Sequence, residues 1–193
     1  MTKHGSDKGR DWHNYTTVYS ALFEPLRALP ITIMELGLGT TNPDIRFNMG
    51  VDGTPGASLR GWRDLFPRAR VFGADIDRSI LFEEDRIQTF YCDQLDQNAI
   101  ADLWAHDGLR DGADIIVDDG LHTFEGNDSF LSASLKHLKP GGIFIVEDIY
   151  ITQKTKWLER VRDFYAKEYP DREFLFIELP NPENKGNNLL LVR

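Results

Sequence analysis

Five short apolar runs recur along the chain, and each of them ends in an acidic residue or in a glycine-rich turn. Such runs are typical of strands that are buried on both faces of a parallel sheet. Stretches with helical spacing lie between them, and an alternation of strands with helices indicates a doubly wound α/β sheet. The predicted strands cover residues 31–36, 69–75, 86–93, 113–119 and 142–148.

Helical spacing predicts helices over residues 15–29, 58–66, 96–108 and 157–169, and a further helix that begins near residue 123. We expect this last helix to end at Lys139-Pro140-Gly141, because proline and glycine terminate helices. Two more apolar runs, at residues 173–179 and 187–193, are separated by a loop rich in proline and asparagine and predict an antiparallel hairpin at one edge. The chain is therefore predicted to form a Rossmann-like, seven-stranded α/β sheet, mostly parallel with a C-terminal antiparallel hairpin.

The composition fits a single globular domain over residues 1–193, in which residues 1–30 form an N-terminal helical segment: 41% of the 193 residues are hydrophobic. The formal net charge of −9 disfavours binding to nucleic acid and to anionic membranes. The single cysteine, Cys92, cannot form an internal disulfide, and no apolar run is long enough to span a bilayer. These features predict a soluble, cytoplasmic protein.

The turn after the first predicted strand reads MELGLGTT and contains Gly37 and Gly39. Two glycines let the backbone approach a ligand closely, but threonine stands where a dinucleotide-binding turn has its third glycine. The long polar loop over residues 40–57 delays the next helix, so the N-terminus of that helix is poorly placed to bind a pyrophosphate. This turn disfavours NAD and favours a cofactor without phosphates. The loop could cover that cofactor or be simply a longer turn, and the cover is favoured because long loops inside compact domains are usually functional.

Three acids, Glu35, Asp75 and Asp93, end three successive predicted strands. In an open α/β sheet the carboxyl ends of the strands face the ligand crevice. Asp75 could accept hydrogen bonds from ribose hydroxyls, and Asp93 from an adenine amino group. Taken singly, each could be a solvated loop acid, but the three together favour a nucleoside pocket.

The next two predicted strands end in the sequences DDGLH and ED. If these strands are neighbours, Asp119, Glu147 and Asp148 lie close together and need a cation between them. Oxygen ligands suit Mg²⁺, Ca²⁺ or Mn²⁺, and zinc is disfavoured because no thiolate or pair of histidines accompanies the acids. Beside such an ion, His122 is placed to act as a general base. The alternative is that Asp119 caps the next helix and that Glu147 binds a backbone amide or a lysine.

The motifs MELGLG, GADID, VDDGLH and IVEDI, in this order, and the N-terminal stretch HGSDKGRDWHNYTTVYSALFEPLR resemble the class I S-adenosylmethionine-dependent methyltransferases. Within that class, they resemble the metal-dependent macrolide sugar O-methyltransferases of the mycinamicin and macrocin type. The resemblance implies His122 as the base. It also implies cofactor contacts from Glu35, Gly37, Ser58, Asp75, Asp93 and Gln94, and Mg²⁺ held by Asp119, Glu147 and Asp148.

The resemblance implies an S-adenosylmethionine- and Mg²⁺-dependent O-methyltransferase that acts on a hydroxyl of a sugar or glycosylated natural product, in antibiotic biosynthesis. The expected partner is a small-molecule hydroxyl acceptor; self-association into a homo-oligomer is left open. The alternatives are an NAD-dependent oxidoreductase and a non-catalytic module that binds S-adenosylmethionine. Trp12, His13 and Tyr15, together with Lys8, could form part of an acceptor wall or close over the cofactor, although a helix packed on the sheet would make Tyr15 a core residue.

Overall fold

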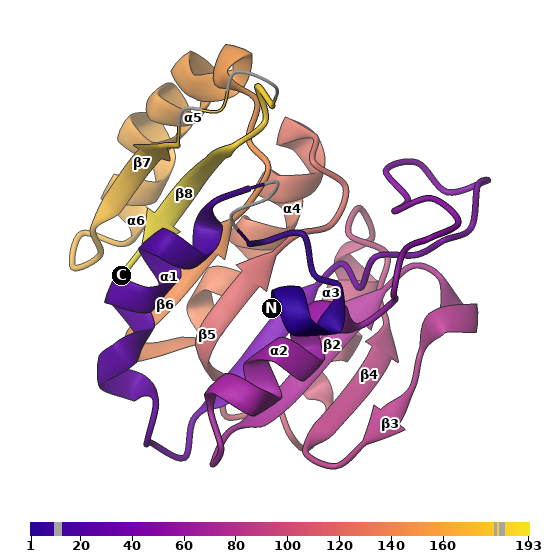
Figure 1. Ribbon diagram of the computed structural model, residues 1–193. Coiled ribbons are helices and arrows are strands. Elements are labelled where there is room, and N and C mark those ends of the chain that lie inside the picture. Colours follow the sequence, from indigo (N-terminus) through magenta and orange to yellow (C-terminus); the bar gives the residue numbers. More distant parts are fainter. Residues whose placement is uncertain (10–12, 180, 182–183) are drawn as a thin grey trace.

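A single mixed sheet forms the centre of the protein in the computed structural model, which describes residues 1–9, 13–179, 181 and 184–193 (Figure 1). Within these residues the sheet has eight strands in the order β3-β4-β2-β1-β5-β6-β8-β7. The strands are β1 (Thr32–Leu36), β2 (Arg70–Asp75), β3 (Glu83–Glu84), β4 (Ile87–Tyr91), β5 (Ala113–Asp118), β6 (Leu138–Val146), β7 (Phe174–Glu178) and β8 (Asn188–Val192).

Helices cover both faces of this sheet (Figure 1). On one face, α1 and α2 pack aromatic side chains such as Tyr19 and Trp62 against the strands. On the other face, α3, α4 and α5 pack residues such as Trp104, Phe130 and Trp157. Successive strand residues point to opposite faces, and both faces are buried, which explains the continuous apolar runs. The helices are α1 (Tyr15–Phe23), α2 (Ala57–Leu65), α3 (Gln97–Ala105), α4 (Phe124–Ser134), α5 (Lys154–Arg160) and α6 (Ala166–Glu168).

The predicted architecture is confirmed, including the C-terminal hairpin, in which β7 and β8 pair in antiparallel fashion. The sheet has one more strand than predicted, because the two-residue β3 pairs with β4 at the opposite edge. So short a strand leaves no apolar pattern in the sequence. The predicted helix over residues 157–169 is divided, because a π-helical turn, Val161–Tyr165, separates α5 from α6.

The helix before β6 ends earlier than the sequence indicates: α4 stops at Ser134, and one 3₁₀ turn leads into β6 at Leu138. Leu138 is 4% exposed and pairs with Ala113 of β5. Lys139 precedes Pro140, and a residue before proline is pushed towards extended backbone. Burial of Leu138 in the sheet and the restraint from Pro140 together favour a strand over another helical turn.

The chain order of the strands defines where a ligand can bind. After β1, the chain forms β2 and then β4, which lie on one side of β1 in the sheet. It then crosses to the other side of β1, where it forms β5 and β6. The connections therefore diverge between β1 and β5, and the crevice at this switch point lies outside the carboxyl ends of the strands. No helix among the described residues is long and apolar enough to cross a membrane.

Candidate functional site

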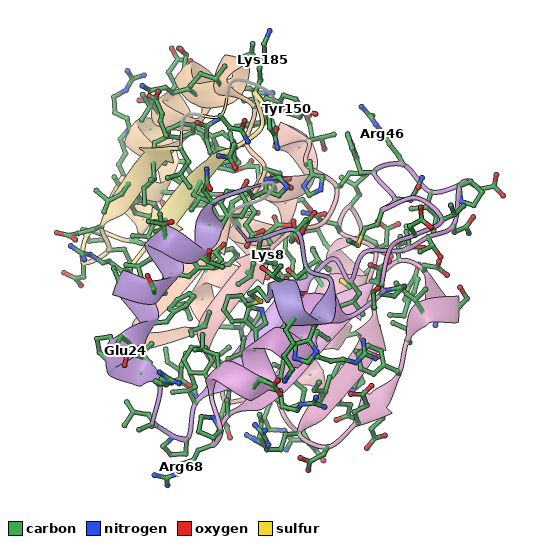
Figure 2. All side chains as sticks on the ribbon, viewed as in Figure 1. Lys8, Glu24, Arg46, Arg68, Tyr150 and Lys185 are labelled. Carbon is green, nitrogen blue, oxygen red and sulfur yellow. The ribbon has the colours of Figure 1, made fainter. Side chains whose placement is uncertain are left out.

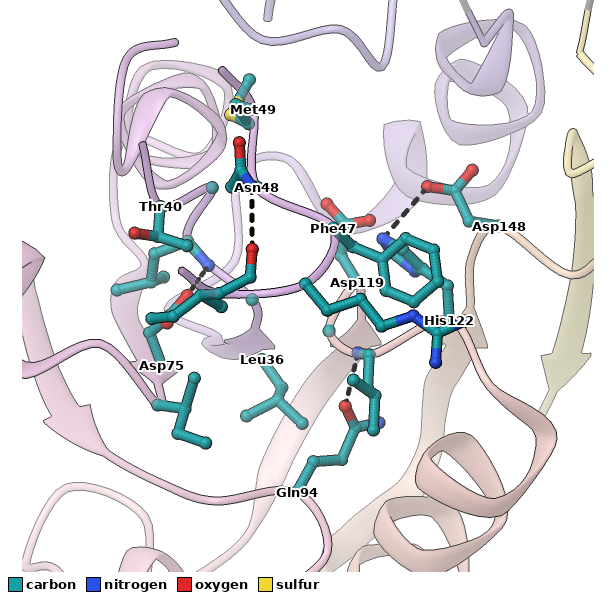
Figure 3. Close-up of a pocket in the computed structure, with 18 of the residues that line it drawn as sticks. Leu36, Thr40, Phe47, Asn48, Met49, Asp75, Gln94, Asp119, His122 and Asp148 are labelled. Atoms are coloured by element: carbon teal, nitrogen blue, oxygen red, sulfur yellow. Dashed lines mark hydrogen bonds and ion pairs between the residues drawn. The ribbon is translucent and has the colours of Figure 1, made fainter. Parts of the chain in front are cut away.

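A pocket of about 870 Å³ lies at this switch point (Figure 3). Its volume falls in the range of small-molecule and cofactor sites. Part of the loop between β1 and α2 lines the pocket, from Asp44 to Met49. The pocket brings together nine of the residues that the sequence predicts for the site: Gly37, Gly39, Ser58, Asp75, Asp93, Gln94, Asp119, His122 and Asp148.

Two predicted site residues, Glu35 and Glu147, are not among the described residues that line the pocket. Both are fully buried. Glu35 lies within β1 and accepts a hydrogen bond from Trp62 Nε1 at 2.6 Å. Glu147 directly follows β6 and donates its backbone N–H to the carbonyl of Asp118 at 2.9 Å. These two carboxylates therefore lie inside the protein, next to the pocket wall.

The turn after β1 requires a glycine at position 37. Gly37 has a φ of +92°, in the region that favours glycine, and a Cβ there would lie 2.0 Å from the carbonyl oxygen of Asp119. The β1 turn thus runs directly against the loop after β5. This contact joins two sides of the pocket, which we call the β2 half (Gly37, Ser58, Asp75 and Asp93) and the β6 half (Asp119, His122 and Asp148).

Asp75 is the buried acid of the β2 half, with 6% of its surface exposed. Its Oδ2 accepts a hydrogen bond from the Leu38 backbone N–H at 2.7 Å, and its Oδ1 accepts one from Asp77 N–H at 2.8 Å. Burial raises the pKa of Asp75 above its usual value. Each carboxylate oxygen can accept a second hydrogen bond, so a pair of ligand hydroxyls fits this position.

Gln94 connects the two halves. Its Nε2 donates to both carboxylate oxygens of Asp118, at 2.8 and 2.9 Å, and its Oε1 accepts the backbone N–H of Leu121 at 2.7 Å. Burial raises the pKa of Asp118 to about 7. The sequence pattern predicted no role for Asp118. The alternation of side chains along β5 is the signal that separates the buried Asp118 from Asp119, which lines the pocket.

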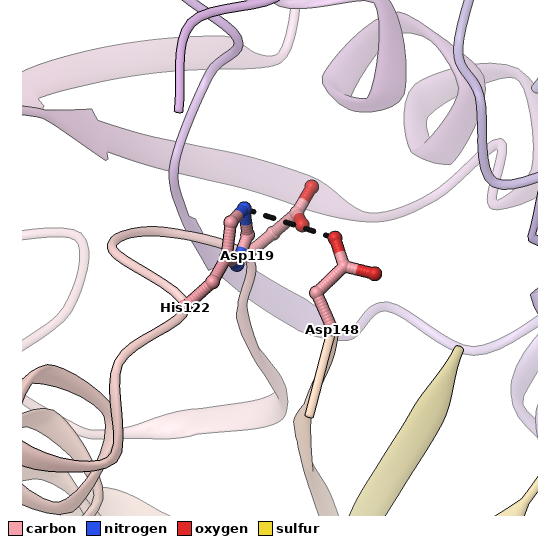
Figure 4. A group of neighbouring side chains, drawn as sticks. All are labelled: Asp119, His122 and Asp148. Atoms are coloured by element: carbon pink, nitrogen blue, oxygen red, sulfur yellow. Dashed lines mark ion pairs between the residues drawn. The ribbon is translucent and has the colours of Figure 1, made fainter. Parts of the chain in front are cut away.

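Three side chains of the β6 half could hold a metal ion (Figure 4). Asp119, His122 and Asp148 each offer one ligand atom, and these atoms lie within 4.8 Å of one another. The His122 Nε2 is 3.7 Å from the Asp148 Oδ2. Two carboxylates and an imidazole suit a divalent cation, but this group contains His122, which was predicted as the base, in place of the predicted ligand Glu147.

Backbone strain marks two of these three residues. His122 and Asp148 have φ values of +53° and +54°, a region that non-glycine residues rarely occupy. Such strain persists only where the surrounding structure holds it, and it concentrates at functional sites. Phe47, from the loop after β1, also has a positive φ and packs its ring edge-on against His122, with the ring centroids 5.3 Å apart. His122 is thus held both by its own turn and by the facing loop (Figure 3).

The N-terminal segment supplies further contacts to the β6 half. Tyr15 is fully buried and donates a hydrogen bond to the Asp148 Oδ1 at 2.6 Å. His13 lines the pocket, and its Nδ1 is 3.2 Å from the same oxygen. Tyr15 is therefore both a core residue of α1 and a contact of the site. Trp12, the remaining aromatic residue considered for the acceptor wall, lies outside the described residues.

Lys8 is the largest departure from what the sequence suggests, because this lysine of a polar segment is only 1% exposed. Its Nζ donates to Asp119 Oδ2 and to Glu147 Oε2, both at 2.5 Å, and lies 3.1 Å from Glu35 Oε1. The other oxygen of Glu147 accepts the Tyr19 hydroxyl. Of the alternatives considered for Glu147, the ion pair with a lysine is present in the structure.

The pKa values of this cluster reflect burial and pairing. Burial by itself lowers the pKa of Lys8, but the neighbouring carboxylates outweigh it and raise the pKa well above the usual value. Burial raises the pKa of Asp119, whereas Lys8 and His122 lower it, and the net direction is downward. Burial also raises the pKa of Glu147 and of Asp148. The Lys8–Asp119 pair is therefore ionised at neutral pH.

The sheet has a glycine turn after β1, an acid at the end of β2 and an antiparallel β8 between β6 and β7, and methyltransferases of known structure share this Rossmann-like fold. Among solved structures, the chain is similar to the methyltransferase MycE from the mycinamycin biosynthetic pathway, determined in complex with Mg and SAH. The two proteins are 25% identical in sequence and superpose with a TM-score of 0.74. The match covers 99% of this chain and 52% of MycE. No protein-family model matches the chain.

Two curated relatives confirm the resemblance to sugar O-methyltransferases within the methyltransferase class. The chain is 35% identical over 151 residues to an 8-demethyl-8-alpha-L-rhamnosyl tetracenomycin-C 2'-O-methyltransferase of Streptomyces olivaceus, a match that covers 76% of this chain and 36% of that protein. It is 32% identical over 139 residues to a demethylmacrocin O-methyltransferase of Streptomyces fradiae, over 72% of this chain and 32% of that protein. The chain thus spans about a third of the length of these relatives.

Proposed function

We propose that this protein is an S-adenosylmethionine-dependent O-methyltransferase that acts on a sugar hydroxyl of a glycosylated natural product, with Mg²⁺ in the β6 half of the pocket. One observation carries this proposal. Asp75, a buried acid that can accept hydrogen bonds, lines the same pocket as Asp119, His122 and Asp148. The similarity to the tetracenomycin and macrocin enzymes supports the substrate class.

The β2 half would hold the cofactor. Asp75 would accept hydrogen bonds from its ribose hydroxyls, and Gly37 would let the backbone approach it closely. The remaining contacts would come from Gly39, Ser58, Asp93 and Gln94. S-adenosylmethionine, when bound, supplies the methyl group. What the chain contributes is position, because holding reactants in attack geometry can be worth about 7–11 kcal/mol.

The β6 half would hold Mg²⁺ through Asp119 and Asp148. The third acid implied by the resemblance, Glu147, has both oxygens engaged by Lys8 and Tyr19 and could join them only by exchanging these partners. When bound, the ion lowers the pKa of the acceptor hydroxyl. His122 would then take the proton, and the neighbouring carboxylates of Asp119 and Asp148 would stabilise the imidazolium that results.

Methyl transfer to a panel of glycosylated natural products, followed by mass spectrometry, tests this proposal. We expect one acceptor class to gain a methyl group, the gain to disappear with EDTA, and excess Mg²⁺ to restore it. A thermal-shift comparison adds a control, since S-adenosylhomocysteine should raise the melting temperature and NAD should not. Full activity in the presence of chelator would refute the metal, and a shift with NAD alone would favour the oxidoreductase.

A further inference from the structure

Asp118 is a buried acid that the proposed chemistry does not use. It ends β5, it is fully buried, and it is not among the described residues that line the pocket. Charged side chains such as Arg68 and Lys185 instead extend from the surface (Figure 2). A buried carboxylate is costly unless hydrogen bonds compensate it. The partners of Asp118 therefore show what this carboxylate does.

The side-chain amide of Gln94 is the main partner of this carboxylate. Its Nε2 lies 2.8 and 2.9 Å from the two oxygens of Asp118, and the backbone N–H of Gly120 donates to the Oδ1 at 3.3 Å. These partners are all donors, so the carboxylate of Asp118 acts as an acceptor towards each of them. An amide turned the other way would place its oxygen against the carboxylate oxygens. Asp118 therefore determines which way the amide of Gln94 faces.

The orientation of this amide decides what its oxygen can hold. With the Nε2 turned to Asp118, the Oε1 of Gln94 accepts the backbone N–H of Leu121 at 2.7 Å (Figure 3). The amide lies so close to this turn that a Cβ at Gly120 would be 2.3 Å from the Oε1. Leu121 directly precedes His122. The amide oxygen of Gln94 therefore fixes the turn that carries His122.

The backbone of Gln94 is held independently of Asp118. The Oγ of Ser129, in α4, donates to the carbonyl of Gln94 at 2.9 Å. Gln94 lines the pocket directly after Asp93, which belongs to the β2 half. Loss of the acceptor at position 118 would leave the main chain of Gln94 in place and free only its side-chain amide.

We infer that Asp118 is a positioning residue. It orients the amide of Gln94, and this amide fixes the turn that carries His122 relative to the bound cofactor. The inference rests on the proposed function, in which Gln94 contacts the cofactor and His122 takes the proton. Asp118 itself touches neither reactant. Its loss should weaken cofactor binding and slow turnover, although every side chain that lines the pocket is unchanged.

Two isosteric substitutions test the pair, because they exchange donors and acceptors at constant size. Asp118→Asn replaces one of the two oxygens that face the Nε2 of Gln94 with a second donor. Gln94→Glu sets two carboxyl groups against each other inside the protein. The double variant, Asp118→Asn with Gln94→Glu, restores a donor opposite a carboxylate, keeps an oxygen for the Leu121 N–H, and has the net charge of the wild type.

The measurements are the affinity for S-adenosylhomocysteine, by calorimetry, and kcat at saturating cofactor and acceptor. We expect Asp118→Asn to lower the affinity about 10-fold, through the loss of a hydrogen bond to a charged group. We expect it to lower kcat about 10–100-fold, because a small misplacement of a reacting group is costly. The double variant should be less impaired than Gln94→Glu alone. A role in stability alone would lower the melting temperature and leave the affinity and kcat unchanged.

The surface of α3 offers matched controls. Asn98 and Asp102 are both exposed on this helix. Asn98→Asp and Asp102→Asn make the same exchanges of amide and carboxylate as the two test substitutions, with the same changes in net charge. Both controls should bind S-adenosylhomocysteine and turn over as the wild type does. A difference from the test variants therefore reports the buried pair.

Wild-type affinity and kcat in Asp118→Asn would overturn the inference, even if the melting temperature falls. A double variant whose loss equals the product of the two single losses would also overturn it, because the two residues would then act independently. If Gln94→Glu does not fold, Asp118→Asn decides by the same two measurements.

The proposed function and this inference fail in different ways. A wild-type protein that binds S-adenosylhomocysteine but methylates no acceptor would refute the proposed function, and the affinities of the variants would still decide the role of Asp118. A wild-type protein that methylates its acceptor, with an Asp118→Asn variant that binds and turns over equally well, would refute this inference alone.

Discussion

The two halves of the pocket hold their carboxylates by different means. In the β2 half, backbone N–H groups of adjacent loops bind Asp75. In the β6 half, side chains of the N-terminal segment bind Asp119 and Asp148 across 111 and 133 residues of sequence. A backbone donor remains whatever side chain its residue carries, but a side-chain donor is lost with one substitution. The β6 half therefore depends more on distant residues than the β2 half does.

The largest expected effect lies in the β6 half and concerns His122. If His122 takes the proton, His122→Ala should lower kcat by about 10²–10⁴ and leave the affinities for cofactor and Mg²⁺ nearly intact. Steady-state kinetics and calorimetry on the same preparation measure both.

Two other outcomes of this substitution would change the role of His122. A large loss of Mg²⁺ affinity would make His122 a metal ligand, which its place beside Asp119 and Asp148 allows. A kcat close to that of the wild type would assign the proton to another group of the β6 half, such as a carboxylate. Either outcome would take the role of base away from His122 and leave the β2 half untouched.

A smaller effect is expected in the β2 half, from Asp75→Ala. Loss of a charge-assisted hydrogen bond in a buried site costs about 1.5–3 kcal/mol, so the affinity for S-adenosylhomocysteine should fall about 10–150-fold. Mg²⁺ affinity should stay at the wild-type level if the halves are as independent as their contacts suggest. Unchanged cofactor binding, measured by calorimetry, would show that Asp75 does not contact the cofactor.

The smallest expected effect is a dependence of cofactor binding on pH. Burial raises the pKa of Asp75 above the ordinary 3.8, so its carboxylate becomes protonated at a higher pH than that of an exposed aspartate. A protonated carboxyl is a poorer acceptor for ribose hydroxyls, so affinity should fall as the pH decreases towards and through that raised pKa. Cofactor affinity is measured at several pH values for wild-type protein and for Asp75→Asn. An equal dependence of affinity on pH in the two proteins would contradict the assignment of Asp75.

The sequence predicted most of the sheet and nine of the residues that line the pocket. Strand-end acids and glycines are local signals, and the rule that ligands bind at the carboxyl ends of parallel strands brings them together. The sequence did not predict β3, the end of α4 or the burial of Lys8. β3 is too short to leave a pattern, although its partner β4 follows it directly. The end of α4 depends on the pairing of Leu138 with Ala113, and the burial of Lys8 depends on ion pairs with distant parts of the chain.

Adjacent acids show most clearly where the sequence stops being informative. Asp118 and Asp119 are neighbours, as are Glu147 and Asp148, yet only the second member of each pair lines the pocket. Asp118 ends β5, and side chains alternate in direction along a strand, so Asp118 and Asp119 point in opposite directions. Glu147 and Asp148 lie after the end of β6, and Asp148 has a φ of +54°, which is not a strand conformation. Since both are acids, the pattern alone predicts a charged strand end but does not identify the ligand.

The sequence by itself determined the alternating strands and helices, the glycine turn after β1 and the acids at the strand ends, because each is a local pattern with a local physical cause. Only the tertiary structure decided that Glu35 and Glu147 lie inside the protein and that Lys8 pairs with them and with Asp119. A buried ion pair forms where folding brings its partners together without water. Partners separated by more than 100 residues leave no periodic signal of that encounter.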